Sequence, residues 1–222
     1  MKGLLIKDFR FTMQQAKMFI VILFMFVIFF FSQGADSAPF IISYTALMGG
    51  MFVLTTISYD DYDHGTTFLL TLPIARKDYV KEKYVFGILG VLGLWALSTA
   101  VYLILGFDEF KEILFMALLV LAVILAFEMI MIPIQLKFGG DKGRMALIGM
   151  VVAAMLLLFV VKSAANQLIH HSAEMETLIY GLTNEISLVS PWVIGAAIAA
   201  ILVIETYISY RISVKVIENR EY

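Results

Sequence analysis

Residues 112–137 read EILFMALLVLAVILAFEMIMIPIQLK, and this stretch decides the fold class. Glu128 is the only charged residue between its two charged ends. A helix needs about 20 mostly apolar residues to cross the hydrocarbon core of a bilayer. The stretch therefore predicts a transmembrane helix that carries one carboxyl group within the membrane.

Similar apolar stretches occur along the rest of the chain. They occupy residues 17–36, 36–60, 83–108, 144–162 and 185–211, the last interrupted by Glu205. The composition agrees, with 61% hydrophobic and 15% charged residues, whereas about 25% of the residues in soluble domains are charged. We expect an all-α membrane protein in which six transmembrane helices form a single domain over residues 1–222.

The net charge, the cysteine content and the motifs of the chain disfavour several classes of function. The net charge of −2 gives no basic field for nucleic acid, and the absence of cysteine excludes disulfides and thiol chemistry. GGDKGR at residues 139–144 lacks the spacing of a phosphate-binding loop. We also find no zinc-protease or serine-hydrolase motif. The chain is therefore not expected to be an enzyme by itself or to bind a cofactor or metal directly.

The lysines and arginines predict the orientation of the spans. All of them except Lys111 and Lys162 fall at the two termini, in the loop after the second span or in the loop after the fourth. They are Lys2, Lys7, Arg10, Lys17, Arg76, Lys77, Lys81, Lys83, Lys137, Lys142, Arg144, Arg211, Lys215 and Arg220. Short basic loops stay in the cytoplasm, so both termini are predicted to be cytoplasmic.

Two segments outside the spans have helical periodicity. Residues 1–17 carry Leu5, Phe9, Met13 and Ala16 at helical intervals with basic residues mostly elsewhere, which favours a helix lying in the membrane interface over a simple extension of the first span. Residues 163–187 predict one or two amphipathic helices on the external side. The adjacent His170 and His171 in that segment are interpreted as solvated rather than as metal ligands.

Four polar or helix-breaking residues lie within predicted spans. Glu128 and Gln135 share one helical face, and Pro133 between them removes a backbone donor. A charge in hydrocarbon is costly, so Glu128 and Glu205 should face protein or water or be protonated. Each suggests either a position on a transport path or a contact between helices. For Glu205, close to the end of its span, we favour the contact, and for Glu128 both remain open.

Small residues predict where helices approach closely. Gly87, Gly90 and Gly93 recur at every third position of the third span. Gly49 and Gly50 interrupt the second span, and Gly195 with Ala199 forms a small pair in the sixth.

The loop after the second span, SYDDYDHGTTFLLTLPIARKDYVKEKY at residues 58–84, has an internal pattern. Asp60, Asp61 and Asp63 end the span and can cap a short helix, which Pro73 then stops. We interpret the loop as a docking element for a soluble partner. The acids together with His64 also suggest a metal site, but the spaced acids and terminal glutamate of a calcium loop are missing.

Three stretches in register resemble bacterial ABC-2-type transporter permeases. They are MKGLLIKDF at residues 1–9, the loop at 58–84, and PIQLKFGGDKGR at 133–144. The chain is similar in particular to the permeases of Gram-positive bacteria that export phenol-soluble modulins, antimicrobial peptides or drugs.

The resemblance implies an exporter subunit in the bacterial plasma membrane. Two permeases, identical or paralogous, would pair, and two separate ATPase subunits would supply ATP and Mg²⁺. Residues 60–76 would form the coupling helix that contacts the ATPase. Its implied contact residues are Asp60, Asp61, Tyr62, Asp63, His64, Phe68, Leu69, Leu72 and Arg76.

Two other functions remain open on the sequence. One is an ion-coupled secondary transporter that uses Glu128, although the two halves of the chain show no evident repeat. The other is a membrane scaffold that transports nothing.

Overall fold

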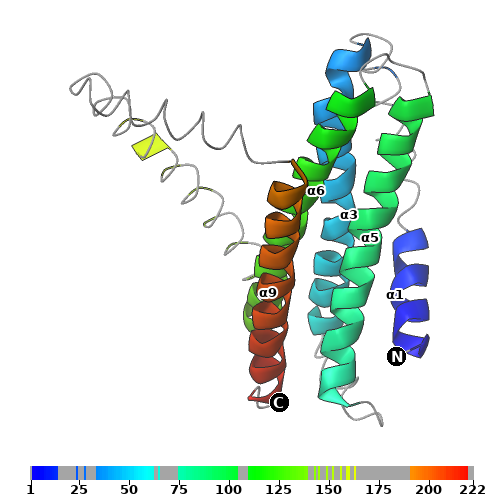
Figure 1. Cartoon of the computed structure of the whole chain (residues 1–222). Coiled ribbons are helices and arrows are strands. Elements are labelled where there is room, and N and C mark those ends of the chain that lie inside the picture. The colour runs from blue at the N-terminus through cyan, green and yellow to red at the C-terminus, as the bar shows by residue number, and fades with distance from the viewer. Residues whose placement is uncertain are drawn as a thin grey trace, which may run out of the picture. The chain divides into compact units, whose positions relative to one another are not determined.

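The computed structural model describes residues 2–14, 34–62, 75–104, 110–139 and 191–219, with single residues between 24 and 163. These segments form α1 (Lys2–Gln14), the 3₁₀ helix η1 (Gly34–Ser37), α3 (Ala38–Asp61), α5 (Arg76–Ile104), α6 (Phe110–Phe138) and α9 (Pro191–Glu218). The part of the chain that the structure describes is all-helical, as the sequence predicts (Figure 1).

Four of the helices are long and apolar enough to cross a membrane: α3, α5, α6 and α9. They correspond to the second, third, fourth and sixth predicted spans. The predicted spans at 17–36 and 144–162 and the external helices at 163–187 lie almost wholly outside the described residues. Two helices extend beyond the predicted spans. The charged residues 76–83 are the first turns of α5, and α9 continues past Arg211 to Glu218.

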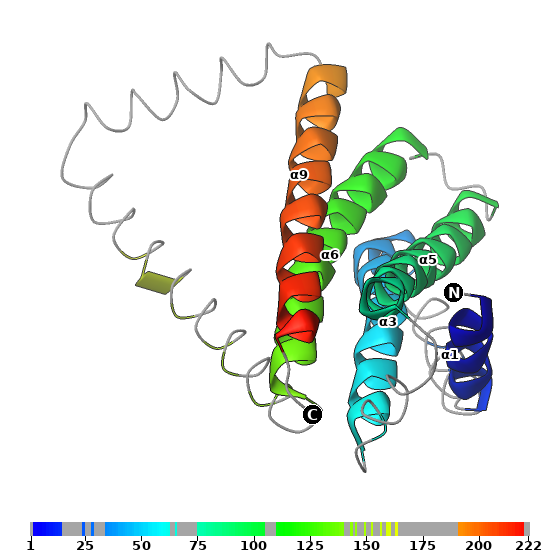
Figure 2. The ribbon, with the colours of Figure 1, turned by 90° about the horizontal axis from the view of Figure 1, so that it is seen from below.

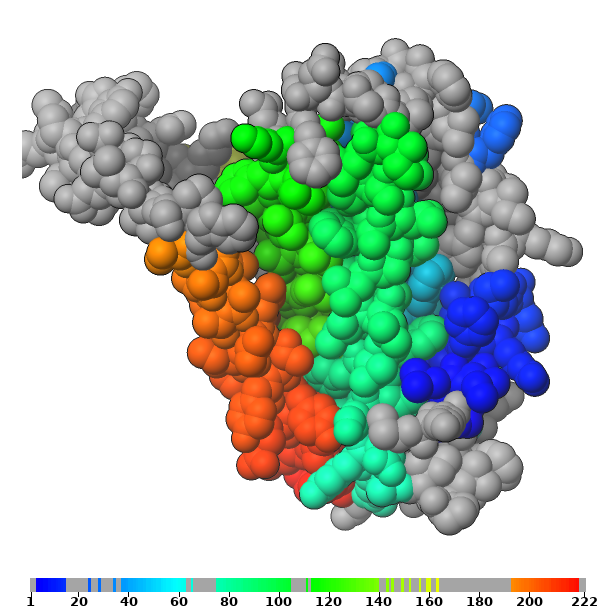
Figure 3. Space-filling view, turned by 45° about the vertical axis from the view of Figure 1, so that its right-hand side comes forward, coloured from blue at the N-terminus to red at the C-terminus, as the bar shows by residue number. Residues whose placement is uncertain are grey.

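The chain divides into two compact units, one comprising residues 1–143 and 202–222 and the other residues 144–201. In the first unit, α3 packs most extensively against α5 and then against α6. Half of the apolar window of α3 is buried, whereas only 6% of that of α9 is. The central helix is therefore α3, and Figure 3 shows the C-terminal part of α9 (red) beside α5.

Hydroxyl side chains in α3 satisfy their own hydrogen-bonding groups locally. Ser43 donates to the Pro39 carbonyl at 2.6 Å, and Thr45 to that of Ile41 at 2.8 Å. Thr55 donates to the carbonyl four residues before it in the same way. Such bonds keep a serine or threonine polar group paired in an apolar environment, so α3 tolerates these residues along a span.

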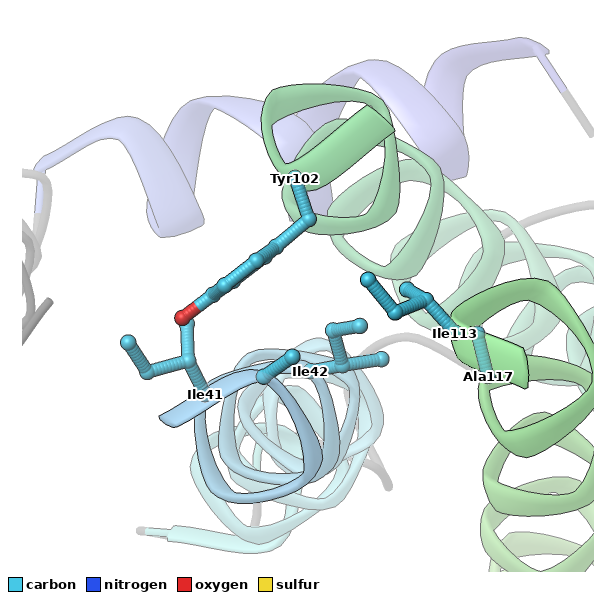
Figure 4. Packing of buried hydrophobic residues seen from close by; sticks show 6 residues of the cluster. Ile41, Ile42, Tyr102, Ile113 and Ala117 are labelled. Atoms are coloured by element: carbon cyan, nitrogen blue, oxygen red, sulfur yellow. The ribbon is translucent and has the colours of Figure 1, made fainter. Parts of the chain in front are cut away.

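Two apolar clusters hold one end of α3, α5 and α6 together. The first contains Ala38, Ile41 and Ile42 of α3, Tyr102 of α5, and Ile113 and Ala117 of α6 (Figure 4). The second, about one turn further along α3, contains Ala46, Val91 and Ile124. Trp95 packs against both clusters, and its indole N–H donates to the Ala117 carbonyl at 2.8 Å.

The helices alternate in direction so that the basic residues gather at one end. In Figure 1, α3 and α6 run one way and α5 the other, which places Asp61, Arg76, Phe138 and the last residue of α9, Glu218, at one end. We call this the basic end, because the lysines and arginines of α5, α6 and α9, except Lys111 at the start of α6, lie in the turns that reach it.

Helix α1 lies against α3 and α5 in both ribbon views (Figures 1 and 2). Leu4 and Asp8 are its buried residues, and the Phe11 ring lies 4.4 Å from the Tyr59 ring of α3. Phe9 and Met13, which the sequence assigns to the membrane interface, are 60% and 58% exposed. The helix is confirmed, and a different stripe, which contains Asp8, faces the protein; the placement of α1 in the membrane interface stays a prediction.

Candidate functional site

A buried lysine lies close to the point where α3 ends. Lys83 is on the third turn of α5 and has no exposed side-chain surface. Its ammonium group lies 2.7 Å from Oδ2 of Asp60 in α3, donates to Asp8 in α1, and donates to Thr56 Oγ1 at 3.2 Å. One side chain of α5 therefore binds two other helices.

Helix α1 contributes both a cation and an anion to the same cluster. Lys7 donates to Asp60, and its ammonium group lies 3.2 Å from the Asp8 carboxylate. Burial would raise the pKa of Asp8, but the ammonium groups of Lys83 and Lys7 outweigh burial and hold its pKa below the usual range. Asp8 thus stays ionised while only 1% exposed.

Two further residues of α5 complete the cluster. The Tyr79 hydroxyl donates to Oδ2 of Asp60 at 3.2 Å, and the ammonium group of Lys83 lies 5.2 Å from the centre of the Tyr79 ring. The fully buried Glu82 carboxylate lies 3.8 Å from Lys83. We call Lys7, Asp8, Asp60, Tyr79, Glu82 and Lys83 the charge cluster.

The charge cluster holds α1, α3 and α5 together through buried charged groups, which destabilise the fold when they lose their partners. Removing one partner of a buried ion pair leaves an uncompensated charge, which destabilises proteins by about 3–5 kcal/mol. The charges come from α1, α3 and α5, so the cluster fixes the position of α1 against the other two helices. It is the only part of α1 that is tied to them by ion pairs among the residues described.

Arg76 ties the other flank of the loop to α9. Its guanidinium group donates to the Ile217 carbonyl at 3.1 Å and to the Glu218 carbonyl at 2.9 Å. Helix C-termini carry unpaired carbonyls and a partial negative charge, which a cation satisfies. Lys77 adds a longer contact of 3.7 Å to the Glu218 carboxylate. The first turn of α5 therefore caps the last turn of α9.

The predicted coupling residues have different surroundings. Asp60 is 6% exposed and lies inside the charge cluster rather than on a surface. Asp61 is half-buried, whereas Tyr62 and Arg76 are exposed. Asp63, His64, Phe68, Leu69 and Leu72 lie outside the described residues. Tyr62 and Arg76 are therefore exposed in the part of the chain that the structure describes, whereas the Asp60 side chain is enclosed.

The carboxyl group of Glu128 lies deep between three helices. Glu128 is 2% exposed, and among the described residues neither carboxyl oxygen has a hydrogen-bond partner. The group lies against Gly50 of α3 and Gly87 of α5. The sequence identified Glu128 as unusual, and the structure supplies its neighbours.

Pro133 creates a binding point for α9. A proline has no N–H to donate, so it leaves the carbonyl four residues earlier, that of Met129, without its helical partner. Ser209 of α9 donates its hydroxyl to that carbonyl. The Tyr84 hydroxyl then bonds Ser209 at 2.6 Å and Ser213 at 2.8 Å. These bonds join α5, α6 and α9.

Gln135 and Glu205 differ in burial. Gln135 is 3% exposed and donates to the Ser58 hydroxyl of α3 at 2.6 Å. Glu205 is only partly buried on α9. Gln135 thus takes part in a contact between helices, whereas the role of Glu205 stays a prediction.

The glycines also separate into two groups. A Cβ atom built on Gly90 would lie 2.7 Å from the Gly49 carbonyl oxygen, so α3 and α5 meet there backbone to backbone. Gly87 accommodates Glu128. A Cβ atom on Gly93 or Gly195 would have no neighbour within 4 Å among the residues described, so neither marks the close contact that the spacing predicts.

Sequence reasoning missed most of the charge cluster. Lys83 was expected to mark the edge of a span, and Asp8 was not singled out. One signal was available: Asp8 is the single acid of α1 and lies one turn after Leu4, on the same face.

Comparison with known proteins identifies the family. A family model described as ABC-2 family transporter protein matches residues 3–218. No curated protein and no solved structure matches the chain. The matched region includes the charge cluster, Glu128 and all four candidate spans. The chain therefore belongs to the ABC-2 transporter family, and it is a multi-pass membrane permease.

Proposed function

We propose that this chain is the membrane subunit of an ATP-driven exporter, and that it moves amphipathic peptides or hydrophobic compounds out of a bacterial cell. Membership of the ABC-2 family supports a permease. The chain has no phosphate-binding loop, so ATP and Mg²⁺ bind a separate ATPase subunit. The substrate class is carried by the resemblance to peptide and drug exporters.

One observation carries the proposal: the residues on both sides of segment 62–75, which joins α3 to α5, are bound to other helices. On one flank Asp60 binds Lys7 of α1 and Lys83 of α5. On the other flank Arg76 caps α9. A displacement of the loop by a bound partner would therefore be passed to α1 and α9 as well as to α3 and α5.

The charge distribution supports the side on which the ATPase binds. Basic residues of α5, α6 and α9 gather at the basic end, which the positive-inside rule assigns to the cytoplasm. Two ATPases would bind there beneath two permease chains, identical or paralogous. The exposed Tyr62 and Arg76 would contact the ATPase directly, and Asp60 would act through the charge cluster.

The test is co-expression of the chain with an ATPase encoded beside its gene. We expect a stable complex that hydrolyses ATP and transports substrate. Reversing the charge of Asp61 should uncouple hydrolysis from transport. The matched control is Lys111→Glu, a charge reversal at an exposed residue of α6 near the opposite end.

A chain that never associates with an ATPase would contradict the proposal. Transport that continues after ATP depletion, under an imposed ion gradient, would instead favour the ion-coupled alternative. No transport under either condition would favour a scaffold.

A further inference from the structure

Glu128 is a buried acid that the proposed function does not use. Its neighbours from α3 are Gly50 and Val53, and from α5 they are Gly87 and Tyr84. The Tyr84 hydroxyl is already bonded to Ser209 and Ser213. Among the described residues, no cation and no hydrogen-bond donor lies against the Glu128 carboxyl group.

Glycines on two helices form the space that this carboxyl group occupies. A Cβ atom on Gly87 would overlap Oε1 of Glu128 and lie 3.1 Å from its Cδ and 3.0 Å from Cγ1 of Val53. A Cβ atom on Gly50 would lie 3.6 Å from the same Cδ. The absence of side chains at both positions makes room for the carboxyl group.

An ionised carboxylate in these surroundings would be strongly disfavoured. Isolated charges removed from water are neutralised rather than retained, and within a membrane the cost is not relieved by solvent. A protonated carboxyl group carries no net charge and matches surroundings in which the described residues offer no cation. A proton is therefore the ligand that these surroundings favour.

We propose that Glu128 is a proton-binding site: it holds a proton while α3, α5 and α6 are packed together and releases it when they separate. Separation admits water, and the carboxylic acid then transfers its proton to a water molecule, giving carboxylate and hydronium. Repacking takes one proton back. The binding step rests on packing alone, and the release step rests on the proposed function.

The surroundings of Glu128 favour the exchange of protons with water at the basic end. On the other side, the Gly49–Gly90 backbone contact and the cluster of Ala46, Val91 and Ile124 close the way with apolar groups. Towards the basic end lie the hydroxyl groups of Thr56 and Ser58 and, beyond them, the charge cluster. Released protons therefore leave on the side where the ATPase would bind.

Infrared spectroscopy of the purified chain in lipid nanodiscs tests the binding step. The wild-type chain at neutral pH should show the C=O stretch of a protonated carboxylic acid, and Glu128→Gln should lose the Glu128 part of that band, whereas any part that comes from the second buried acid, Glu82, should stay. Glu205→Gln, on the less buried acid of α9, is the matched control and should keep it. An identical band in the wild-type chain and in Glu128→Gln, or no such band in the wild-type chain, would overturn the proposal.

A second pair of variants covers the case in which Glu128→Gln does not fold. Gly87→Ala should displace the carboxyl group and shift or remove the band, whereas Gly93→Ala, with open space at its Cβ position, should leave it unchanged. A band unaffected by Gly87→Ala would show that it arises elsewhere, and would overturn the assignment to Glu128.

The release step is tested on the complex with its ATPase. Addition of a non-hydrolysable ATP analogue should reduce the Glu128 band, and full intensity in the nucleotide-bound complex would overturn release. Failure to obtain any ATPase complex would count against the proposed function and leave the measurement on the chain alone unaffected. The two failures are therefore distinguishable.

Discussion

The ammonium group of Lys83 lies 2.7 Å from Oδ2 of Asp60, and neither side chain is more than 6% exposed. The pair joins the end of α3 to the start of α5, on either side of the loop that we propose as the ATPase contact. The stability of the chain and its response to a partner should therefore depend on the same few residues.

Replacing Lys83 should be strongly destabilising. Lys83→Met keeps the length of the side chain but removes the fully buried cation that Asp8 and Asp60 share and leaves them the partly exposed Lys7, so we expect a loss of about 3–5 kcal/mol. Denaturation in detergent micelles, followed by loss of helical signal, measures it. Lys81→Met, on an exposed position of the same helix, should change stability by less than about 0.5 kcal/mol. Equal stabilities of the two variants would contradict the ion-pair account.

The charge cluster should also make stability depend on pH. The pKa of Asp8 is lowered in the folded chain, so its contribution is complete above the pKa of an unfolded aspartate, about 3.9. It is lost as the pH falls from there through the folded value. Asp8→Asn should flatten the acid limb of a stability–pH curve, whereas Asp78→Asn, on an exposed residue of α5, should preserve it. An unchanged acid limb in Asp8→Asn would refute this assignment.

Arg76 should matter more for coupling than for folding. Arg76→Ala removes two hydrogen bonds to the last carbonyls of α9, at an exposed position where each bond contributes about 1 kcal/mol or less. We expect near-normal thermal stability but a reduced ratio of transport to ATP hydrolysis. Lys77→Ala, which removes only the 3.7 Å contact to Glu218, is the control. Equal coupling in the two variants would show that the α9 cap is not used.

Pro133 and Ser209 should be energetically coupled. Ser209→Ala leaves the Met129 carbonyl unpaired, which costs about 1–3 kcal/mol for a buried group. Pro133→Ala restores an N–H that can bond this carbonyl within α6. In a double-mutant cycle, the cost of Ser209→Ala should therefore be smaller in the Pro133→Ala background. Additive effects would rule out the proline as the reason for the contact.

The glycines provide an internal comparison of packing. Gly90→Ala places a methyl group 2.7 Å from the Gly49 carbonyl oxygen and should destabilise the chain by about 1–3 kcal/mol through overpacking. Gly93→Ala, three residues away in α5, meets open space and should be neutral or slightly stabilising, because alanine favours a helix. Thermal unfolding of the two purified variants measures the difference. A Gly93→Ala variant less stable than Gly90→Ala would refute the α3–α5 contact.

The helical class and four spans could be read from the sequence because they follow from long apolar stretches, which need no tertiary information. The Gly49–Gly90 approach was suggested by composition, but the sequence could not separate Gly90 from Gly93, because a repeat of three does not return to the same face of a helix with 3.6 residues per turn. Which glycine meets a neighbour is set by the partner helix.

The charge cluster was beyond sequence reasoning for a different reason. Lys83 follows several charged residues, and such residues are usually solvated at a membrane surface. It is buried because α1 crosses over this end of α3 and α5 and brings Asp8 to it. The sequence suggests that Asp60 belongs to a partner-binding surface, whereas its ion pairs with Lys7 and Lys83 place it inside.

The hydrogen bond between the Trp95 indole and the Ala117 carbonyl has a practical consequence. The chain has only two tryptophans, at 95 and 192, so Trp192→Phe leaves a single indole, which is held between α5 and α6. Indole emission moves to longer wavelength when the ring gains contact with water. The emission of Trp95 can therefore report whether α5 and α6 are packed together or separated, without an attached dye.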